Sequence, residues 1–243
     1  MKRILLASAC ALAFVSPACA DVSATLSGQY FNLQGPGWQQ SDFRLTGVGA
    51  VPLGMSNLSL QGSAEYEYAG SGGFDWSEGT FAITPFWTGD NVRAALSVGR
   101  TQVLTFSAWN AGFGAEYFLS PDFTVAAKGG VWWGAEGTAG GYAGGQATYY
   151  WMPDFALSGT VDYSKVPFGY DLSFEARGEY QLWNQLSVYG GYKYVDESHS
   201  PANILFIGLK LYCDGNGPAT LVDHQRRGTV GYISTFDSLW FHD

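Results

Sequence analysis

Leu58-Ser-Leu-Gln-Gly-Ser-Ala-Glu-Tyr-Glu-Tyr68 is the stretch of the sequence that decides the fold. Every second residue is apolar, small or aromatic, and the residues between them, ending with Glu65 and Glu67, are polar. Successive side chains of a β-strand point to opposite faces, so this stretch predicts a strand with one apolar and one polar face. A turn-like segment at 52–57 comes directly before it.

The same alternating unit recurs down the chain and predicts an all-β protein. Further segments are expected at 22–31, 42–51, 78–87, 92–98, 103–119, 123–133, 143–151, 155–163, 171–182, 186–194 and 203–212. That makes about twelve strands of about ten residues, the length that a tilted strand needs to cross a bilayer, with 10 or 14 strands as alternatives. Connectors near 54, 89, 121, 153 and 183 are mostly tight, whereas those near 35, 72, 137, 167 and 199 are longer or richer in Gly and Pro. This alternation is typical of an up-and-down antiparallel barrel. Pro85 lies on the apolar face of its segment and predicts a bulge or a strand end there.

The placement of charge distinguishes a lipid-facing surface from a protein core. No charged side chain falls in the middle of a predicted strand on its apolar face, and Arg100 and Lys165, which share that face, lie at strand ends. A charge on the lipid face costs about 2–4 kcal/mol at the bilayer centre, so this absence is expected of a transmembrane barrel. Tyr and Trp collect at strand ends, where aromatic girdles form, namely at Tyr66, Tyr68, Trp87, Tyr149, Trp151, Tyr163 and Tyr194. A secreted β-sandwich is the rival fold, because it would bury the same faces in a protein core.

The N-terminus has the pattern of a secretory signal peptide. Lys2 and Arg3 precede an apolar run at 4–15, and the small residues at 18–20 fit the cleavage rule, which places the mature start at Asp21. Cleavage removes two basic residues and no acidic one, and lowers the formal net charge from −9 to −11. A chain this acidic, without a basic patch, is not expected to bind nucleic acid.

The rest of the composition excludes several classes of protein. Charged residues make up only 14% of the chain and aromatic residues 16%, which does not suit a soluble enzyme or a disordered chain. No run of about 18 apolar residues follows the signal, so no transmembrane helix is expected. Cys213 is the one cysteine after residue 20, so no intramolecular disulfide is expected.

With the signal, the alternation and turns such as Leu119-Ser-Pro-Asp-Phe123, the sequence resembles Gram-negative outer-membrane β-barrels of the porin type. The resemblance covers residues 21–213 and implies a barrel in the outer membrane, in contact with its lipid and lipopolysaccharide, as a monomer or a homo-trimer. Such chains usually end in a strand that closes with Phe. Here a tail at 214–243 follows the last predicted strand. We expect this tail to be periplasmic, where it could be disordered, plug the lumen or contain the true closing strand.

The polar faces of the predicted strands supply the candidate site. The residues expected to line the lumen and set its selectivity are Arg44, Glu65, Glu67, Glu78, Arg93, Glu116, Lys128, Asp162, Glu175, Arg177 and Lys193. Hairpin pairing predicts that Arg44 lies near Glu65, that Glu67 lies near Glu78, and that Glu175 and Arg177 approach Lys193. Charged walls set the ion preference of a channel, and the acidic excess at Glu65, Glu67 and Glu78 favours cations.

The expected function is passive diffusion of small hydrophilic solutes or ions, without a cofactor or a metal. A structural or surface-interaction barrel with a blocked lumen is the alternative. An outer-membrane lipid hydrolase or peptidase is a third reading. It would depend on His199, because His224 and His242 lie in the tail. Adjacent residues in one loop rarely form a catalytic triad, since a scaffold must fix the geometry, so the protein is not expected to be an enzyme.

Overall fold

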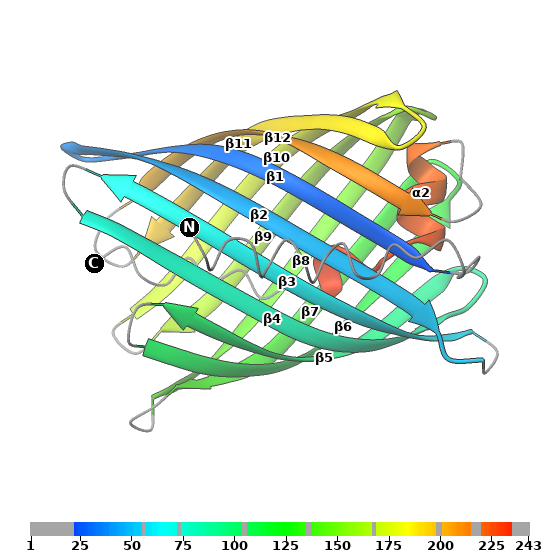
Figure 1. The fold of residues 1–243 in the computed structure, drawn as a ribbon, viewed down its shortest axis with the longest axis horizontal. Helices are drawn as coiled ribbons and strands as arrows, with labels where there is room; N and C mark the ends of the chain where they lie inside the picture. Colours follow the sequence, from blue (N-terminus) through cyan, green and yellow to red (C-terminus); the bar gives the residue numbers. More distant parts are fainter. Residues whose placement is uncertain are drawn as a thin grey trace, which may run out of the picture.

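The protein is a closed barrel of twelve antiparallel strands in a computed structural model (Figure 1). The structure describes residues 22–54, 57–71, 74–103, 106–134, 138–166, 169–197, 201–214 and 220–234. Each strand pairs with its neighbours in sequence, and β1 pairs with β12 to close the barrel. The strands are β1 (Ser23–Gly35), β2 (Trp38–Pro52), β3 (Leu58–Ser71), β4 (Phe74–Thr88), β5 (Val92–Val103), β6 (Phe106–Ser120), β7 (Phe123–Gly134), β8 (Ala139–Met152), β9 (Phe155–Val166), β10 (Gly169–Trp183), β11 (Leu186–Glu197) and β12 (Ala202–Asp214). The prediction of a twelve-strand up-and-down barrel is therefore confirmed.

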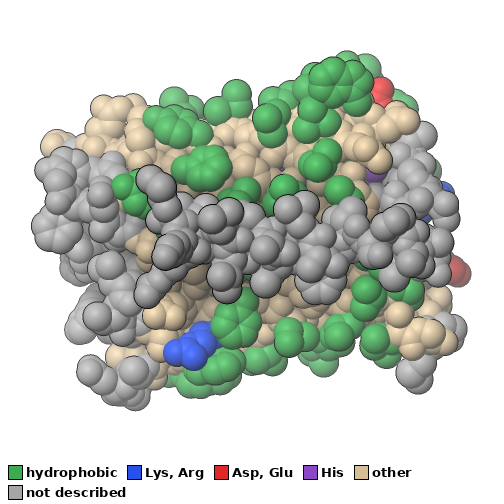
Figure 2. All heavy atoms as spheres, viewed as in Figure 1, with side chains coloured by type: hydrophobic (Ala, Val, Ile, Leu, Met, Phe, Trp, Pro, Cys, Tyr) green, Lys and Arg blue, Asp and Glu red, His purple; other side chains and the backbone are tan. Residues whose placement is uncertain are grey.

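The alternating faces of the strands separate an apolar exterior from a polar interior. On the outside, Leu96 and Phe113 are each 64% exposed, and large apolar side chains are exposed on every strand. Figure 2 shows this hydrophobic surface on one side of the barrel. On the inside, polar side chains such as Gln61, Thr84 and Ser187 are fully buried. The polarity is the inverse of a soluble protein, as expected for a barrel whose solvent outside is lipid.

Exposed aromatic residues gather toward both ends of the strands. We use "terminal end" for the end of the barrel where β1 begins and β12 ends, and "loop end" for the other. The exposed aromatics toward the terminal end are Trp87, Tyr117, Tyr149, Trp151, Tyr180 and Trp183, and those toward the loop end are Tyr30, Tyr68, Trp109, Trp133, Tyr163 and Tyr170. Amphipathic rings favour the level of the lipid headgroups, so the two sets mark two membrane interfaces.

Two details of the predicted strands are wrong. The strands contain 12 to 15 residues rather than about ten, because several stretches predicted as loops continue the ladders. Connectors are consequently short at both ends of the barrel, and Pro36-Gly37 joins β1 to β2 as a turn in which Gly37 has a φ of 85°. Pro85 neither ends β4 nor shifts its register. The β4–β5 ladder skips Thr84 and Pro85, while Leu60 of β3 still pairs with Pro85.

The C-terminal segment at 220–234 returns into the barrel after β12. It contains the short helix α2 (Leu221–Arg227) and the single-turn 3₁₀ helix η2 (Tyr232–Ser234). Thr220 caps α2, because its side chain accepts a hydrogen bond from the Asp223 amide. In Figure 1, α2 lies at the terminal end of the barrel, beside the end of β12. No helix in the described part of the chain is long and apolar enough to cross a membrane.

Candidate functional site: the lumen

The interior of the barrel holds a cavity of about 290 Å³ lined by side chains from most of the strands. Arginine and lysine residues line it in the same number as acidic residues. The basic residues are Arg44, Arg93, Lys128, Arg177, Lys193, Lys210 and Arg226. The acidic residues are Asp42, Glu65, Glu67, Glu116, Asp162, Glu175 and Glu179. Ten of the eleven predicted site residues are in this lining. Glu78 is buried but does not contribute to the cavity wall.

Acidic residues dominate the wall formed by β2, β3 and β4. Arg44 bonds the Glu67 carboxylate at 2.6 Å, and its Nε also lies 3.5 Å from Glu65. The register places Glu67 directly opposite Glu78, and Asp42 is buried on the same wall. Arg44 thus binds Glu65 and Glu67, and Asp42 and Glu78 add two further carboxylates to the same wall.

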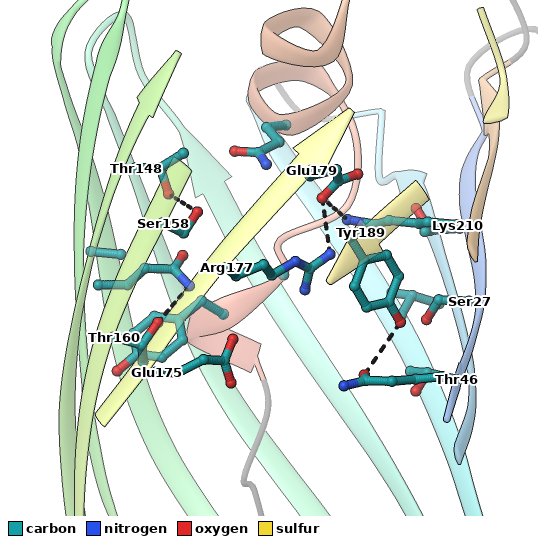
Figure 3. Close-up of a pocket in the computed structure, with 18 of the residues that line it drawn as sticks. Ser27, Thr46, Thr148, Ser158, Thr160, Glu175, Arg177, Glu179, Tyr189 and Lys210 are labelled. Carbon is teal, nitrogen blue, oxygen red and sulfur yellow. Dashed lines mark hydrogen bonds and ion pairs between the residues drawn. The ribbon is translucent and has the colours of Figure 1, made fainter. Parts of the chain in front are cut away.

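The wall formed by β10, β11 and β12 is richer in basic residues (Figure 3). Glu175 lies opposite Lys193 in the register, as hairpin pairing predicts. Arg177 instead bonds Glu179 at 2.9 Å and stacks on Tyr189, with its guanidinium carbon 3.9 Å from the ring centroid.

Glu179 is the centre of a buried network on this wall that sequence reasoning missed. It accepts hydrogen bonds from Ser187 at 2.6 Å and Tyr212 at 2.5 Å, and Lys210 lies 3.8 Å away. Glu179 and Lys210 both occupy alternating positions on the polar faces of their strands, and this is the one feature of the sequence that indicates that they point into the lumen. Their mutual approach depends on a register across three strands, which the sequence does not show.

A third wall, formed by β7, β8 and β9, carries uncharged polar groups beside the pair of Lys128 and Asp162. Gln146 donates a hydrogen bond to the Thr160 hydroxyl at 3.1 Å, and the Thr148 and Ser158 hydroxyls are 3.0 Å apart. Figure 3 shows these residues facing the charged wall across the lumen. The lumen therefore presents mainly charged groups on two walls, and mainly hydroxyl and amide groups on the third.

An inward-facing apolar cluster interrupts the polar lining on β1, β11 and β12, and the sequence analysis did not anticipate it. Its buried members are Phe31, Leu33, Tyr189, Val195, Ile204 and Phe206. Arg44 stacks on Phe31, with its guanidinium carbon 4.8 Å from the ring centroid.

Arg93 joins the barrel wall to the C-terminal segment. Its Nε donates to Glu116 at 2.8 Å, and its other nitrogens donate to the backbone carbonyls of Gln225 and Gly228. The side chain is 2% exposed. Arg93 and Glu116 are predicted to line the lumen, but Arg93 bonds the C-terminal segment that lies inside it, and Glu116 is the partner of Arg93 on the wall.

Gln61 makes a second connection between the wall and the C-terminal segment. Its side-chain amide donates to the Val230 carbonyl at 2.9 Å and accepts from the Val230 N–H at 2.8 Å. Gln61 is fully buried, so its amide satisfies backbone groups that no strand pairs. Gln61 belongs to the stretch that decides the fold, but the sequence pattern identifies it only as a residue on the polar face of the strand.

The end of the described segment reaches further into the lumen. The Tyr232 hydroxyl donates to Asp162 at 2.7 Å, and Lys128 lies 3.4 Å from the same carboxylate and 4.2 Å from the Tyr232 ring centroid. Inward-facing glycines make room for it, since a Cβ on Gly114 would lie 2.5 Å from Ile233. The two remaining predicted site residues, Lys128 and Asp162, thus also contact the segment.

The histidines do not form a catalytic group in the described part of the chain. His224 is buried, stacks on Tyr212 with ring centroids 4.1 Å apart, and has its Nε2 2.6 Å from the Asn184 carbonyl. His199 and His242 lie outside the described residues. Among the described residues, no three His, Cys, Asp or Glu side chains are placed to hold a metal ion.

Comparisons with known proteins extend these observations to the fold. No protein-family model and no curated protein matches the chain. Among solved structures, the NanC porin is similar with a TM-score of 0.66 at 12% identity over 76% of this chain and 98% of that one. The KdgM porin in complex with disordered oligogalacturonate has a TM-score of 0.59 at 12% identity, over 77% of this chain and 98% of that one. An outer-membrane channel from Pseudomonas putida F1 has a TM-score of 0.56 at 10% identity, over 82% of this chain and 98% of that one. The chain therefore has the fold of outer-membrane porins and channels.

Proposed function

We propose that the chain forms a narrow passive channel for small hydrophilic solutes or ions in a bacterial outer membrane. One observation carries this proposal: a cavity lined by charged and hydroxyl side chains lies inside a barrel whose outer surface is apolar. An interior of this polarity is suited to water and polar solutes. The fold shared with the porins supports the same reading and the outer-membrane location. On this proposal the terminal end faces the periplasm.

Single-channel recording tests the proposal directly. The full chain, refolded and inserted into a planar bilayer, is expected to give small, discrete conductance steps in a simple salt solution. Complete absence of steps from correctly folded barrels, at every voltage that the bilayer withstands, would contradict an open channel.

The C-terminal segment at 220–234 narrows this channel in our proposal. Arg93 and Gln61 hold it from β5 and β3, and Tyr232 and Ile233 reach the lumen wall at Asp162 and Gly114. Bonds to this many strands favour a segment that stays in place while the channel conducts. We call residues 220–234 the plug.

Truncation separates a narrowed channel from a blocked one. Removal of residues 215–243 is expected to raise the conductance several-fold, because the plug then no longer occupies the terminal end. A full chain without conductance whose truncated form conducts would instead favour a barrel closed at rest. Equal conductance of the two forms would show that the plug does not limit passage. A refolding assay on both forms confirms that each barrel is closed.

Cation preference is the finer part of the proposal, and it depends on the acidic wall. The lining as a whole is balanced, so a preference must come from the local excess of carboxylates around Arg44. In a salt gradient, the Glu65→Gln, Glu67→Gln double variant is expected to shift the reversal potential toward anions. Thr46→Val is the matched control, since it removes the 3.1 Å hydrogen bond to Glu65 but no charge. An unchanged reversal potential in the double variant would remove these residues from the conduction path.

A further inference from the structure

Arg100 is a cation on the surface of the barrel that faces lipid. Its neighbours of the same parity on β5, Leu96 and Val98, are 64% and 52% exposed. Ser97 and Thr101, which have the opposite parity, are buried inside. The register sets Arg100 beside Phe81 of β4 and Trp109 of β6, which are both exposed. Arg100 therefore points outward among large apolar side chains.

The guanidinium of Arg100 has unused hydrogen-bonding capacity. It donates one hydrogen bond, from Nη2 to the Ser107 hydroxyl at 3.3 Å, and its Nε is buried without a partner. No carboxylate of the described residues forms an ion pair with it, although a guanidinium offers five N–H donors. Because the Nε is enclosed by the protein, an acceptor supplied from outside the chain would bind the terminal Nη groups.

Trp109 holds this guanidinium in a fixed place. The guanidinium carbon lies 5.5 Å from the Trp109 ring centroid, and Trp109 packs edge-to-face on Phe81 with ring centroids 6.4 Å apart. Stacking on an indole restricts the side chain while leaving the edge of the guanidinium free to bind. Trp109 also belongs to the aromatic set toward the loop end, which places the pair at headgroup level.

Lys165 provides a comparison on the same lipid-facing surface. It is exposed at the end of β9 and has the same outward parity as Val161 and Tyr163. Unlike Arg100, it does not stack on an aromatic ring in the described part of the chain. The ammonium group of a lysine in this position is carried on a flexible side chain, whereas the guanidinium of Arg100 is planar and is held against a ring.

We propose that Arg100 and Trp109 form a binding site for a phosphate group of an outer-leaflet lipid, and specifically of lipopolysaccharide. A guanidinium binds phosphate oxygens through two parallel hydrogen bonds, and at this depth the phosphate comes from a membrane lipid. The chain carries a formal net charge of −9, so an anionic lipid is not attracted to the barrel as a whole and needs a local cation. The inference depends on the proposed outer-membrane location, with the loop end outward, but not on conductance.

Lipid retention tests the site in the full chain. The wild type, Arg100→Gln and Lys165→Gln are reconstituted in bilayers of phosphatidylcholine with a small fraction of labelled lipopolysaccharide. Lipopolysaccharide that copurifies after detergent exchange is then measured. Arg100→Gln is expected to retain about fivefold less, the effect of one basic residue at an anionic membrane surface, and Lys165→Gln to retain close to the wild-type amount. Trp109→Leu, which keeps the charge but removes the ring, is expected to fall between them.

Three results would overturn the inference. Wild-type retention by Arg100→Gln would exclude the site, and equal losses in Arg100→Gln and Lys165→Gln would reduce it to a general charge effect. Displacement of lipopolysaccharide by millimolar inorganic phosphate would show that the ligand is not a lipid embedded in the membrane. Conductance, recorded on the same samples, is expected to be unchanged in Arg100→Gln, so that a failed lipid site and a failed channel are distinguishable.

Discussion

The two halves of the lumen are built on the same alternating strands, but they neutralise their charges differently. In the half toward the loop end, Arg44 binds Glu65 and Glu67 of the adjacent strand. In the half toward the terminal end, Arg93 binds Glu116 of the adjacent strand and also two backbone carbonyls of the plug. Ion pairs along the wall leave the centre of a barrel open. A segment that returns into the barrel and bonds to the wall fills the centre instead.

This difference teaches that a charged residue on the inner face does not by itself indicate an open pore. Lys128 and Asp162 have the same alternation as Arg44, but both contact Tyr232 of the plug. A barrel of twelve strands lies between the small packed barrels and the wide channels, so its width is decided by what occupies the lumen.

The largest expected effect comes from neutralising Arg93. In Arg93→Gln, the buried Glu116 carboxylate loses its cationic partner, and two plug carbonyls lose a donor, which should lower the free energy of unfolding by about 3–5 kcal/mol. Arg44→Gln is the matched variant in the other half. The Arg44 side chain is 15% exposed against 3% for Arg93, and it bonds the Glu67 carboxylate but no plug carbonyl, so a smaller loss of about 1.5–3 kcal/mol is expected. Urea unfolding of the refolded barrels, followed by tryptophan fluorescence, measures both.

Equal losses in Arg93→Gln and Arg44→Gln would contradict the distinction between the two halves. A conductance that rises in Arg93→Gln but not in Arg44→Gln would sharpen it, because only the first variant loosens the plug.

The sequence predicts the barrel well because lipid imposes a rule on every strand. Outward residues must be apolar and inward residues can be polar, so alternation and the absence of charge on one face mark the strands from β1 to β12. Strand ends are weaker signals. Gly-rich stretches such as 69–71 look like loops but continue the ladder of β3, because pairing with β4 satisfies their backbone groups.

The candidate site is predictable only where neighbouring strands form it. Tight turns fix the register, so the contact of Arg44 with Glu65 and the pairing of Glu67 with Glu78 follow from the sequence. The contacts of Arg93 and Gln61 with the plug do not follow. Their acceptors are backbone groups of Gly228 and Val230, and a backbone carbonyl has no sequence identity.

Gln61 offers a smaller test of the same comparison. Gln61→Leu removes the two hydrogen bonds that Gln61 makes with the buried Val230 backbone, and the loss should cost about 1–3 kcal/mol. Gln146→Leu on β8 loses one hydrogen bond, to a partly buried hydroxyl, and should cost less than about 1 kcal/mol. Urea unfolding again gives the values, and the reverse order would show that Val230 finds other partners without Gln61.

The smallest effect, and the most discriminating, concerns two hydroxyl pairs of similar geometry. Thr25 of β1 and Thr229 of the plug have their Oγ1 atoms 3.3 Å apart, and Thr80 of β4 and Thr101 of β5 have theirs 3.0 Å apart. Replacing either Thr229 or Thr101 by Val removes one neutral hydrogen bond, so both variants should lose about 0.5–1.5 kcal/mol.

Conductance should separate these two variants even though stability does not. Thr229→Val weakens the attachment of a segment inside the lumen, and more frequent transitions between conductance levels are expected in single-channel records. Thr101→Val weakens a bond between two strands that eight other ladder pairs still hold in register, and its records should match the wild type. Similar records from both variants would mean that the plug moves with the wall as one body, and the two halves of the lumen would then differ in contents but not in dynamics.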